Sequence, residues 1–296
     1  MKLKHWIYAA RIHTLPLSFS GITLSYLISK SRTNECITTS YILCIITALL
    51  LQILANFSND YGDSITGVDN IKRIGPKRTI QRGLISLSEM KKAIFILSIL
   101  SFLSGVTLLY NSIKNIFIFF LYFIGIFICI YSSIKYSIGD YPYGHKVGMG
   151  DLFVMICFGF FSVGGSSFLY THTLCMDMFF LSLSIGFLNV GVLNVNNMRD
   201  LENDYESGKY TMAVWLGIKY AKLYHVFIIL FSIFFGGYFI FLNQKNTYQW
   251  LFFIFISILL IFHIRKIILI KEKKLFNLEL KKLVILTFLY VFSIGL

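Results

Sequence analysis

Nine apolar runs, separated by polar segments rich in lysine and arginine, divide this chain of 296 residues almost from end to end. They cover residues 15–29, 41–57, 93–110, 116–131, 152–170, 178–195, 226–242, 250–264 and 283–296. Only 14% of the residues are charged, against about a quarter in soluble domains. Within a bilayer, helices and closed barrels alone satisfy the backbone, and these runs lack the alternation of barrel strands. The sequence therefore predicts an all-α, polytopic membrane helix bundle of nine transmembrane helices, forming one domain over residues 1–296.

The basic residues are distributed very unevenly between the two ends of the predicted bundle. The N-terminal segment and the even-numbered loops hold 23 of the 27 Lys and Arg residues, and the other loops hold 4. Basic residues concentrate on the cytoplasmic side of membrane proteins. We therefore expect a cytoplasmic N-terminus, an outside C-terminus and a bacterial inner-membrane location. The net charge of +13 is explained by this topology, without a nucleic-acid partner.

The five cysteines show no spacing typical of metal ligands. Their number is odd, which argues against a complete set of disulfides. We interpret them as small apolar residues that fill space between helices. They are Cys36, Cys44, Cys129, Cys157 and Cys175.

Half of the 14 acidic residues fall in two short stretches that follow the second and sixth runs. Several runs are shorter than the roughly 20 residues needed to cross a bilayer, so we expect the helices to continue into these stretches. Residues three and four apart then share a helix face. One stripe would comprise Asn59, Asp60 and Asp63, followed by Asp69, and the other Asn196, Asp200 and Asp204.

Such stripes are suited to binding a metal and a phosphorylated ligand. Asp and Asn oxygens are hard ligands for Mg²⁺, which shares its coordination shell with water and phosphate oxygens. We predict metal ligation by Asn59, Asp63, Asp69, Asn196, Asp200 and Asp204, with Asp60 as an alternate ligand or a support for the ligands. Neighbouring basic residues can neutralise phosphate charge. These are Lys72, Arg73, Lys77, Arg78, Arg82, Arg199 and Lys209.

Two other interpretations of the stripes remain open. Each polar residue could simply cap a helix or lie in a solvated loop, although this leaves the repeated spacing unexplained. Paired carboxylates at helix breaks also occur in the ion pathways of secondary transporters. Transporter carboxylates usually lie nearer the membrane midplane than these helix ends do.

The two stripes together resemble the signatures of the UbiA-type intramembrane aromatic prenyltransferases. The first signature is similar to Asn59, Asp60 and Asp63 followed by Asp69, and the second to Asn196, Asp200 and Asp204. Asp69 departs from the commoner spacing, because Gly67 occupies the position four residues after Asp63. Residues 59–63, 73–78, 81–83, 11–16 and 141–144 are similar to the branch that acts on 1,4-dihydroxy-2-naphthoate in menaquinone biosynthesis.

The resemblance implies a Mg²⁺-dependent enzyme that transfers a polyprenyl group from an allylic diphosphate to 1,4-dihydroxy-2-naphthoate. Loss of CO₂ would then give demethylmenaquinol. Sibling enzymes use 4-hydroxybenzoate, homogentisate or haem as acceptors, so other aromatic acceptors are alternatives. The implied substrate contacts are Arg11, for the acceptor's carboxylate, with Arg73, Lys77, Arg78, Tyr131, Lys135, Arg199 and Lys209. The family also has a motif in which a tyrosine is followed four residues later by a lysine, and Tyr131 and Lys135 match it. Tyr136 and Asp140 have the same spacing, with an acid in place of the lysine, so either tyrosine is a candidate.

Overall fold

The computed structural model describes residues 3–33, 37–71, 73–244 and 246–296, and over these ranges it contains helices and loops without strands. This confirms the all-α prediction. The short helices are α1 (Leu3–Ala9), η1 (Ile12–Thr14), η2 (Tyr143–His145) and η4 (Lys273–Leu275). The long ones are α2 (Leu15–Lys30), α3 (Thr38–Ile65), α4 (Leu87–Ser112), α5 (Ile116–Lys135), the continuous α6 (Met149–Val154), η3 (Met155–Gly165) and α7 (Ser166–Thr171), α8 (Met176–Glu206), α9 (Met212–Leu242), α10 (Thr247–Leu269) and α11 (Phe276–Gly295).

Each predicted run coincides with the body of one long helix, and most helices extend beyond their run. Seven helices of the described chain are long and apolar enough to cross a membrane, namely α3, α4, α5, the α6–η3–α7 helix, α8, α9 and α10. The chain is therefore a multi-pass membrane protein. The remaining two, α2 with 16 residues and α11 with 20, fall outside that set, so a total of nine spans stays a prediction.

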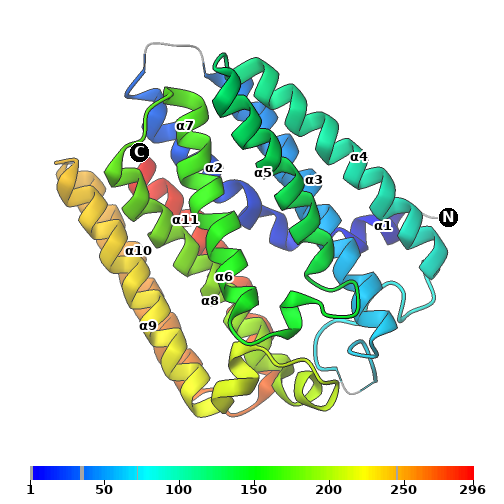
Figure 1. Ribbon diagram of the computed structural model, residues 1–296. Helices are drawn as coiled ribbons and strands as arrows, with labels where there is room; N and C mark the ends of the chain where they lie inside the picture. Colours follow the sequence, from blue (N-terminus) through cyan, green and yellow to red (C-terminus); the bar gives the residue numbers. More distant parts are fainter. Residues whose placement is uncertain (1–2, 34–36, 72, 245) are drawn as a thin grey trace.

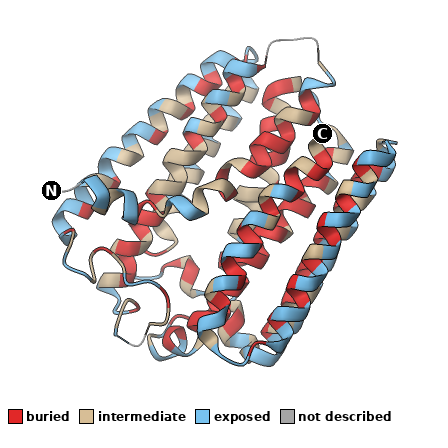
Figure 2. Cartoon of the chain, turned by 180° about the vertical axis from the view of Figure 1, so that it is seen from behind, coloured by how far each residue is buried: buried red, intermediate tan, exposed pale blue. Residues whose placement is uncertain are grey.

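Helix α8 lies at the centre of the bundle. In its most apolar stretch 72% of the residues are buried, against 39% or less in the other six candidate spans. It packs on α9, η3 and α11, whereas α3, α4 and α5 pack on one another (Figure 1). Figure 2 shows buried residues along the inner helices and exposed residues along the outer ones. Many exposed residues of α4, α5, α9 and α10 are large and apolar, as expected for surfaces that face lipid.

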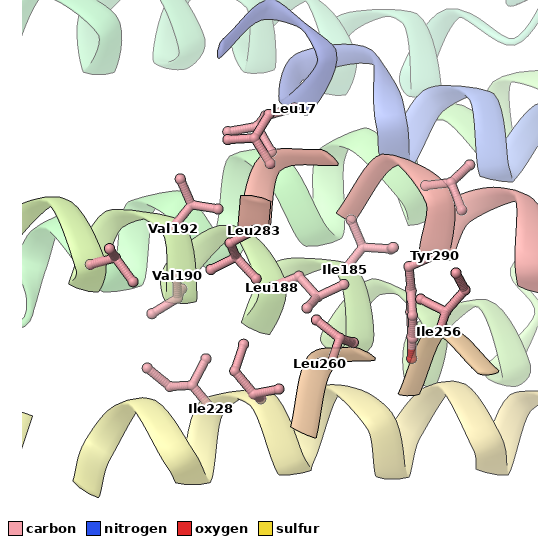
Figure 3. Packing of buried hydrophobic residues seen from close by; sticks show 14 of the residues in the cluster. Leu17, Ile185, Leu188, Val190, Val192, Ile228, Ile256, Leu260, Leu283 and Tyr290 are labelled. Carbon is pink, nitrogen blue, oxygen red and sulfur yellow. The ribbon is translucent and has the colours of Figure 1, made fainter. Parts of the chain in front are cut away.

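The largest buried cluster joins α8 to α9, α10, α11 and α2. Figure 3 shows Ile185 and Leu188 of α8 facing Ile228 of α9, Leu260 of α10 and Leu283 of α11. Small residues allow close approach as well, because a Cβ on Gly159 of η3 would lie 2.5 Å from the Ser182 carbonyl oxygen of α8. Packing of this kind gives the site a rigid frame.

The loops that follow α3, α5 and α8 gather at one end of the bundle, the lower end in Figure 1. The Asn203 side chain of α8 donates a 2.8 Å hydrogen bond to the Val68 carbonyl, which follows α3. The Tyr210 backbone N–H, which follows α8, donates to the His145 carbonyl over 3.1 Å. These bonds hold the three loops together and bring the two predicted stripes to the same end.

Candidate active site

The acidic stripe of α3 lies on the last two turns of the helix. The Asn59 side-chain amide donates to Asp63 Oδ2 and to Ser137 Oγ, both over 2.9 Å. Asp63 is only 3% exposed. Gly62 permits this close contact with the loop after α5, because a Cβ there would lie 2.2 Å from the Ser137 carbonyl oxygen. The expected continuation of the helix beyond its apolar run is thus confirmed.

Asp60 is held by cationic partners rather than facing open space. Arg11 pairs with its carboxylate, and Arg78 Nε lies 3.5 Å from the same oxygen. The Thr79 hydroxyl donates to the other carboxylate oxygen over 3.3 Å. Arg11 also donates to Asn59 Oδ1 over 2.8 Å, so its guanidinium connects the N-terminal segment to α3. Asp60 is thus fixed in place by Arg11, Arg78 and Thr79.

The second stripe lies on the last turns of α8. Arg199 donates to both oxygens of Asp200, over 2.9 and 2.5 Å, and to Asn196 Oδ1 over 2.8 Å. Asp204 lies 3.8 Å from the Lys209 ammonium. Although burial lowers the pKa of Lys209, the carboxylates of Asp63 and Asp204 raise it above its usual value. Lys209 is therefore shared by the stripes of α3 and α8.

Asp69 and two arginines form a second link between the stripes. The Asp69 side chain is fully buried, 3.3 Å from Arg73 Nε and 4.0 Å from Arg78 Nε. Burial and the Asp63 carboxylate raise the pKa of Asp69 to about 6, although both arginines lower it. Burial and the guanidinium groups of Arg11 and Arg73 lower the pKa of Arg78 to about 9. The site thus crowds carboxylates together and guanidinium groups together, and the like charges shift one another's pKa values.

A cavity of about 1510 Å³ opens at this end of the bundle and continues between the helices. Its polar end is lined by Asn59, Asp60, Asp63, Asn196, Asp200, Asp204, Arg11, Arg73, Arg78, Arg199 and Lys209. The structure thus brings eleven of the predicted site residues together. Farther in, the lining is apolar and includes Leu51, Ile124, Phe158 and Leu169. The cavity can therefore hold a ligand with a charged head and a long apolar tail.

Five predicted residues of the described chain do not line this cavity. One of them, Arg82, is exposed and lies over the ring of Tyr8. Asp69 lies behind the arginines that line the cavity, and Lys77 is exposed on the loop, where its carbonyl accepts a hydrogen bond from Tyr8. Tyr131 is 63% exposed, and the Lys135 ammonium lies beside Gly139. Lys72 lies outside the described residues. The structure thus places Tyr131 at the surface and leaves half-buried Lys135 outside the cavity lining.

Tyr136 and His145 lie near the polar end of the cavity, which Tyr131 and Lys135 do not line. Tyr136 lines the cavity, and burial together with the neighbouring Asp63 carboxylate raises its pKa to about 12. His145 Nε2 lies 3.7 Å from Asp63 Oδ1. The second frame of the Tyr-containing motif already pointed to Tyr136, whereas no spacing signal marks His145. Asn277 and Lys281 of α11 also line the cavity without a sequence signal.

The donor set fits a hard divalent cation, although the carboxylates are paired with cationic side chains as they stand. Within the described ranges, no group of three His, Cys, Asp or Glu side chains is arranged to hold a metal ion. However, Asp63 Oδ1 and both carboxylate oxygens of Asp69 are buried and accept no hydrogen bond. Asp63 Oδ1 has only His145 nearby, and Asp69 Oδ1 has only the ion pairs with Arg73 and Arg78. Buried oxygens of this kind need a cation or a donor. The oxygens present are thus of the type that hard divalent cations prefer.

Comparisons with known proteins point to one family of membrane enzymes. The profile of the UbiA prenyltransferase family matches residues 18–285. The 1,4-dihydroxy-2-naphthoate octaprenyltransferase of Haemophilus influenzae is 40% identical over 235 residues, covering 77% of this chain and 74% of that protein. The Escherichia coli protein of the same name is 37% identical over 251 residues, covering 83% and 80%.

Two solved structures share the fold. A UbiA homolog from Archaeoglobus fulgidus bound to GPP and Mg²⁺ has a TM-score of 0.65 at 14% identity, covering 98% of this chain and 97% of that one. A UbiA homolog from Aeropyrum pernix in its apo form has a TM-score of 0.64 at 16% identity, covering 100% and 97%. The bundle, the two oxygen-rich helix ends and these matches establish that the chain belongs to the UbiA prenyltransferase family.

Proposed function

We propose that this enzyme transfers a polyprenyl group from an allylic polyprenyl diphosphate to 1,4-dihydroxy-2-naphthoate, with loss of CO₂, giving demethylmenaquinol for menaquinone biosynthesis. One observation carries the proposal: oxygen ligands from α3 and α8 meet arginines at the mouth of an apolar cavity. The names of the two bacterial relatives support the acceptor. Other aromatic acceptors, such as 4-hydroxybenzoate and homogentisate, are the alternatives.

The polar end of the cavity would bind the diphosphate. Mg²⁺, when bound by Asn59, Asp63, Asp69, Asn196, Asp200 and Asp204, would neutralise charge on the leaving diphosphate. Arg73, Arg78, Arg199 and Lys209 would donate charge-assisted hydrogen bonds to the phosphate oxygens. In the described structure five cations (Arg11, Arg73, Arg78, Arg199, Lys209) face five carboxylates (Asp60, Asp63, Asp69, Asp200, Asp204). A metal–diphosphate complex, whose own charges largely cancel, suits such a balanced site.

The apolar part of the cavity would hold the prenyl chain and keep water from the reacting carbon. The allylic C–O bond breaks, and the diphosphate leaves with the electron pair. The electron-rich ring then forms a C–C bond from the carbon that bears the carboxylate. Release of CO₂ returns an electron pair to the ring and restores its aromaticity. Arg11, at the cavity mouth beside Asn59, is suited to hold the acceptor's carboxylate until this step.

The proposed topology places this chemistry at the cytoplasmic face of a bacterial inner membrane. Helices α2 and α11 would complete nine spans, with polar end residues reaching the interface. The loops after α3, α5 and α8, which carry much of the basic excess, would then be cytoplasmic. The N-terminus would lie inside and the C-terminus outside. Residues 1–296 would form one domain around the cavity.

Product analysis on the purified protein in detergent tests the function. With farnesyl diphosphate, Mg²⁺ and 1,4-dihydroxy-2-naphthoate labelled in its carboxyl carbon, we expect a prenylated naphthoquinol and labelled CO₂. EDTA should stop both, and added Mg²⁺ should restore them. Parallel reactions with 4-hydroxybenzoate and homogentisate identify the acceptor. A product from one of these and none from the naphthoate would overturn the proposed substrate.

A further inference from the structure

One face of α5 forms a wall of the cavity along most of the helix. The residues on this face follow one another at intervals of three or four, as expected for one side of a helix, and they line the cavity. They include Tyr122, Gly125, Cys129, Ser132 and, just after the helix, Tyr136. Because Tyr136 lies near the polar end, this face leads from there into the apolar part of the cavity.

The opposite face of α5 packs on α4 instead (Figure 1). The rings of Phe123 and Phe127 lie against Phe102 of α4, with centroids 5.8 and 5.3 Å apart, and neither of these α5 residues lines the cavity. Gly125 lies two residues from each of them, which places it on the other side of the helix. The missing side chain of Gly125 therefore leaves space in the cavity and not against α4.

Neither packing nor backbone geometry requires a glycine at position 125. A Cβ built there would meet no atom of another part of the described chain within 4 Å. Gly105 of α4 is different, because a Cβ there would lie 2.8 Å from Ile126 Cδ1. Gly125 is also not among the glycines with positive φ, and glycine is one of the least favourable residues within a helix. What Gly125 provides is therefore open space in the cavity.

The wall formed by η3 comes close to α5 near this level. Three residues before Gly125, the Tyr122 hydroxyl of α5 donates a 3.0 Å hydrogen bond to the Gly165 carbonyl at the end of η3. The two walls are thus about one tyrosine side chain apart there. Gly164 and Gly165 also line the cavity, so the facing wall carries small residues as well. A bulky side chain at position 125 would therefore occupy much of the space between α5 and η3.

The position of Gly125 also defines a distance from the polar end of the cavity. Gly125 precedes Tyr136 by eleven residues, which is about 16 Å along the helix. An extended prenyl unit adds four chain bonds of about 1.5 Å each and so spans roughly 5 Å. The third unit of a bound chain would therefore reach Gly125. The cavity continues farther, since its lining on α3 runs from Asp63 back to Cys44, about 28 Å.

We propose that Gly125 determines which donors this enzyme accepts, because it keeps the cavity open for prenyl chains of more than three units, and that its donors belong to this class. The inference rests on the proposed function, which places the diphosphate at the polar end. Chains of one or two units end before Gly125, so the residue there does not affect them. Longer chains pass it, and a side chain that blocks their path removes the apolar contacts beyond it.

Binding of donor analogues tests the proposal without turnover. The probes are geranyl, farnesyl, geranylgeranyl and octaprenyl thiolodiphosphates, in which sulfur replaces the bridging oxygen and slows cleavage. Calorimetry in one detergent with Mg²⁺ gives the Kd of each probe for the parent, Gly125→Ala and Gly125→Leu. The ratio of variant to parent cancels the partition of each chain into micelles. Gly125→Ala should bind all four probes within about twofold of the parent, because its methyl group has room.

Gly125→Leu should bind the geranyl probe within about twofold of the parent and the geranylgeranyl and octaprenyl probes at least tenfold more weakly. A second variant, Cys129→Phe, tests the distance. Cys129 lies one turn nearer the polar end, about 10 Å from Tyr136. This variant should therefore weaken the farnesyl probe at least tenfold as well, whereas Gly125→Leu should affect that probe less.

The outcomes separate this inference from the proposed function. If Gly125→Leu weakened all four probes equally, or none of them, the inference would be wrong. The same holds if Cys129→Phe left the limit at the same chain length. Failure of the parent to bind any probe would overturn the proposed function, and the inference with it. Because no acceptor is present, a different aromatic acceptor would leave every one of these results unchanged.

Discussion

Arg73 and Asp200 connect the two oxygen-rich helix ends, with the Arg73 Nη2 atom 3.7 Å from the Asp200 carboxylate. Arg73 follows α3 and also pairs with Asp69, whereas Asp200 belongs to α8 and also pairs with Arg199. The contact explains how the loop after α3 folds back over α8. It also means that a phosphate entering the site would compete with Asp200 for the Arg73 guanidinium, which frees a carboxylate as it binds.

Asp200→Asn should strongly reduce prenyl transfer. The change keeps the side-chain shape but removes the charge that holds Arg73 and Arg199 and that would bind Mg²⁺. Loss of one such electrostatic contact typically costs about 10²–10³ in kcat. Steady-state rates across a range of Mg²⁺ concentrations measure it.

Glu202→Gln provides the matched control on the same helix. The Glu202 side chain is 74% exposed and pairs with Lys273, away from the main cavity. Its rate should stay within about twofold of the parent, because exposed ion pairs contribute little. Equal losses in both variants would indicate a general effect of charge on α8 and contradict the role assigned to Asp200.

Arg78→Gln should weaken binding of the diphosphate donor far more than Lys77→Gln does. Arg78 lines the cavity, whereas the neighbouring Lys77 is exposed. Removing a charge-assisted hydrogen bond costs about 1.5–3 kcal/mol, which is at least a tenfold rise in KM for the donor. KM values for the donor at saturating acceptor make the comparison. Similar increases for both variants would place the phosphates over the exposed part of the loop instead.

The helices themselves could be predicted because the solvent imposes them. A long apolar run in a bilayer must be helical. The main difference from the predicted runs is that α3 and α8 extend further into the polar sequence that follows them. Convergence of the stripes also followed from helix periodicity and loop parity. Asn196, Asp200 and Asp204 share a face of α8, and they line the same cavity as Asn59 and Asp63 of α3.

Contacts made by irregular segments could not be predicted in the same way. His145 reaches Asp63 because the loop after α5 folds back under the bundle, and no period in the sequence encodes that path. The choice between Tyr131 and Tyr136 depends on where α5 ends, since Tyr131 is within the helix and Tyr136 follows it.

Tyr136→Phe and Tyr131→Phe should show which of the two tyrosines contacts the substrate. Tyr136 is half-buried in the cavity wall. Loss of its hydroxyl should therefore lower kcat/KM about tenfold, which corresponds to a hydrogen bond of roughly 1.4 kcal/mol. Tyr131 is 63% exposed, and its variant should resemble the parent. The measurement is kcat/KM for donor and acceptor in turn. A larger loss from Tyr131→Phe would show that the first frame makes the contact.

Gly236→Ala should destabilise the bundle, whereas Gly237→Ala should not. A Cβ on Gly236 would lie 1.9 Å from the Tyr290 hydroxyl, which is fixed by hydrogen bonds of 2.9 Å to Ser184 and to the Ser232 carbonyl. At Gly237 the nearest atom is at 3.4 Å, an ordinary contact.

Overpacking of this kind costs about 1–3 kcal/mol of unfolding free energy. The midpoint of thermal unfolding in detergent should therefore fall by several degrees for Gly236→Ala and hold for Gly237→Ala. Combining Gly236→Ala with Tyr290→Phe should recover part of the loss, because the clashing oxygen is removed along with its hydrogen bonds. If the double variant were as unstable as the sum of the two single ones, the clash would not be the cause, since residues in contact are expected to couple.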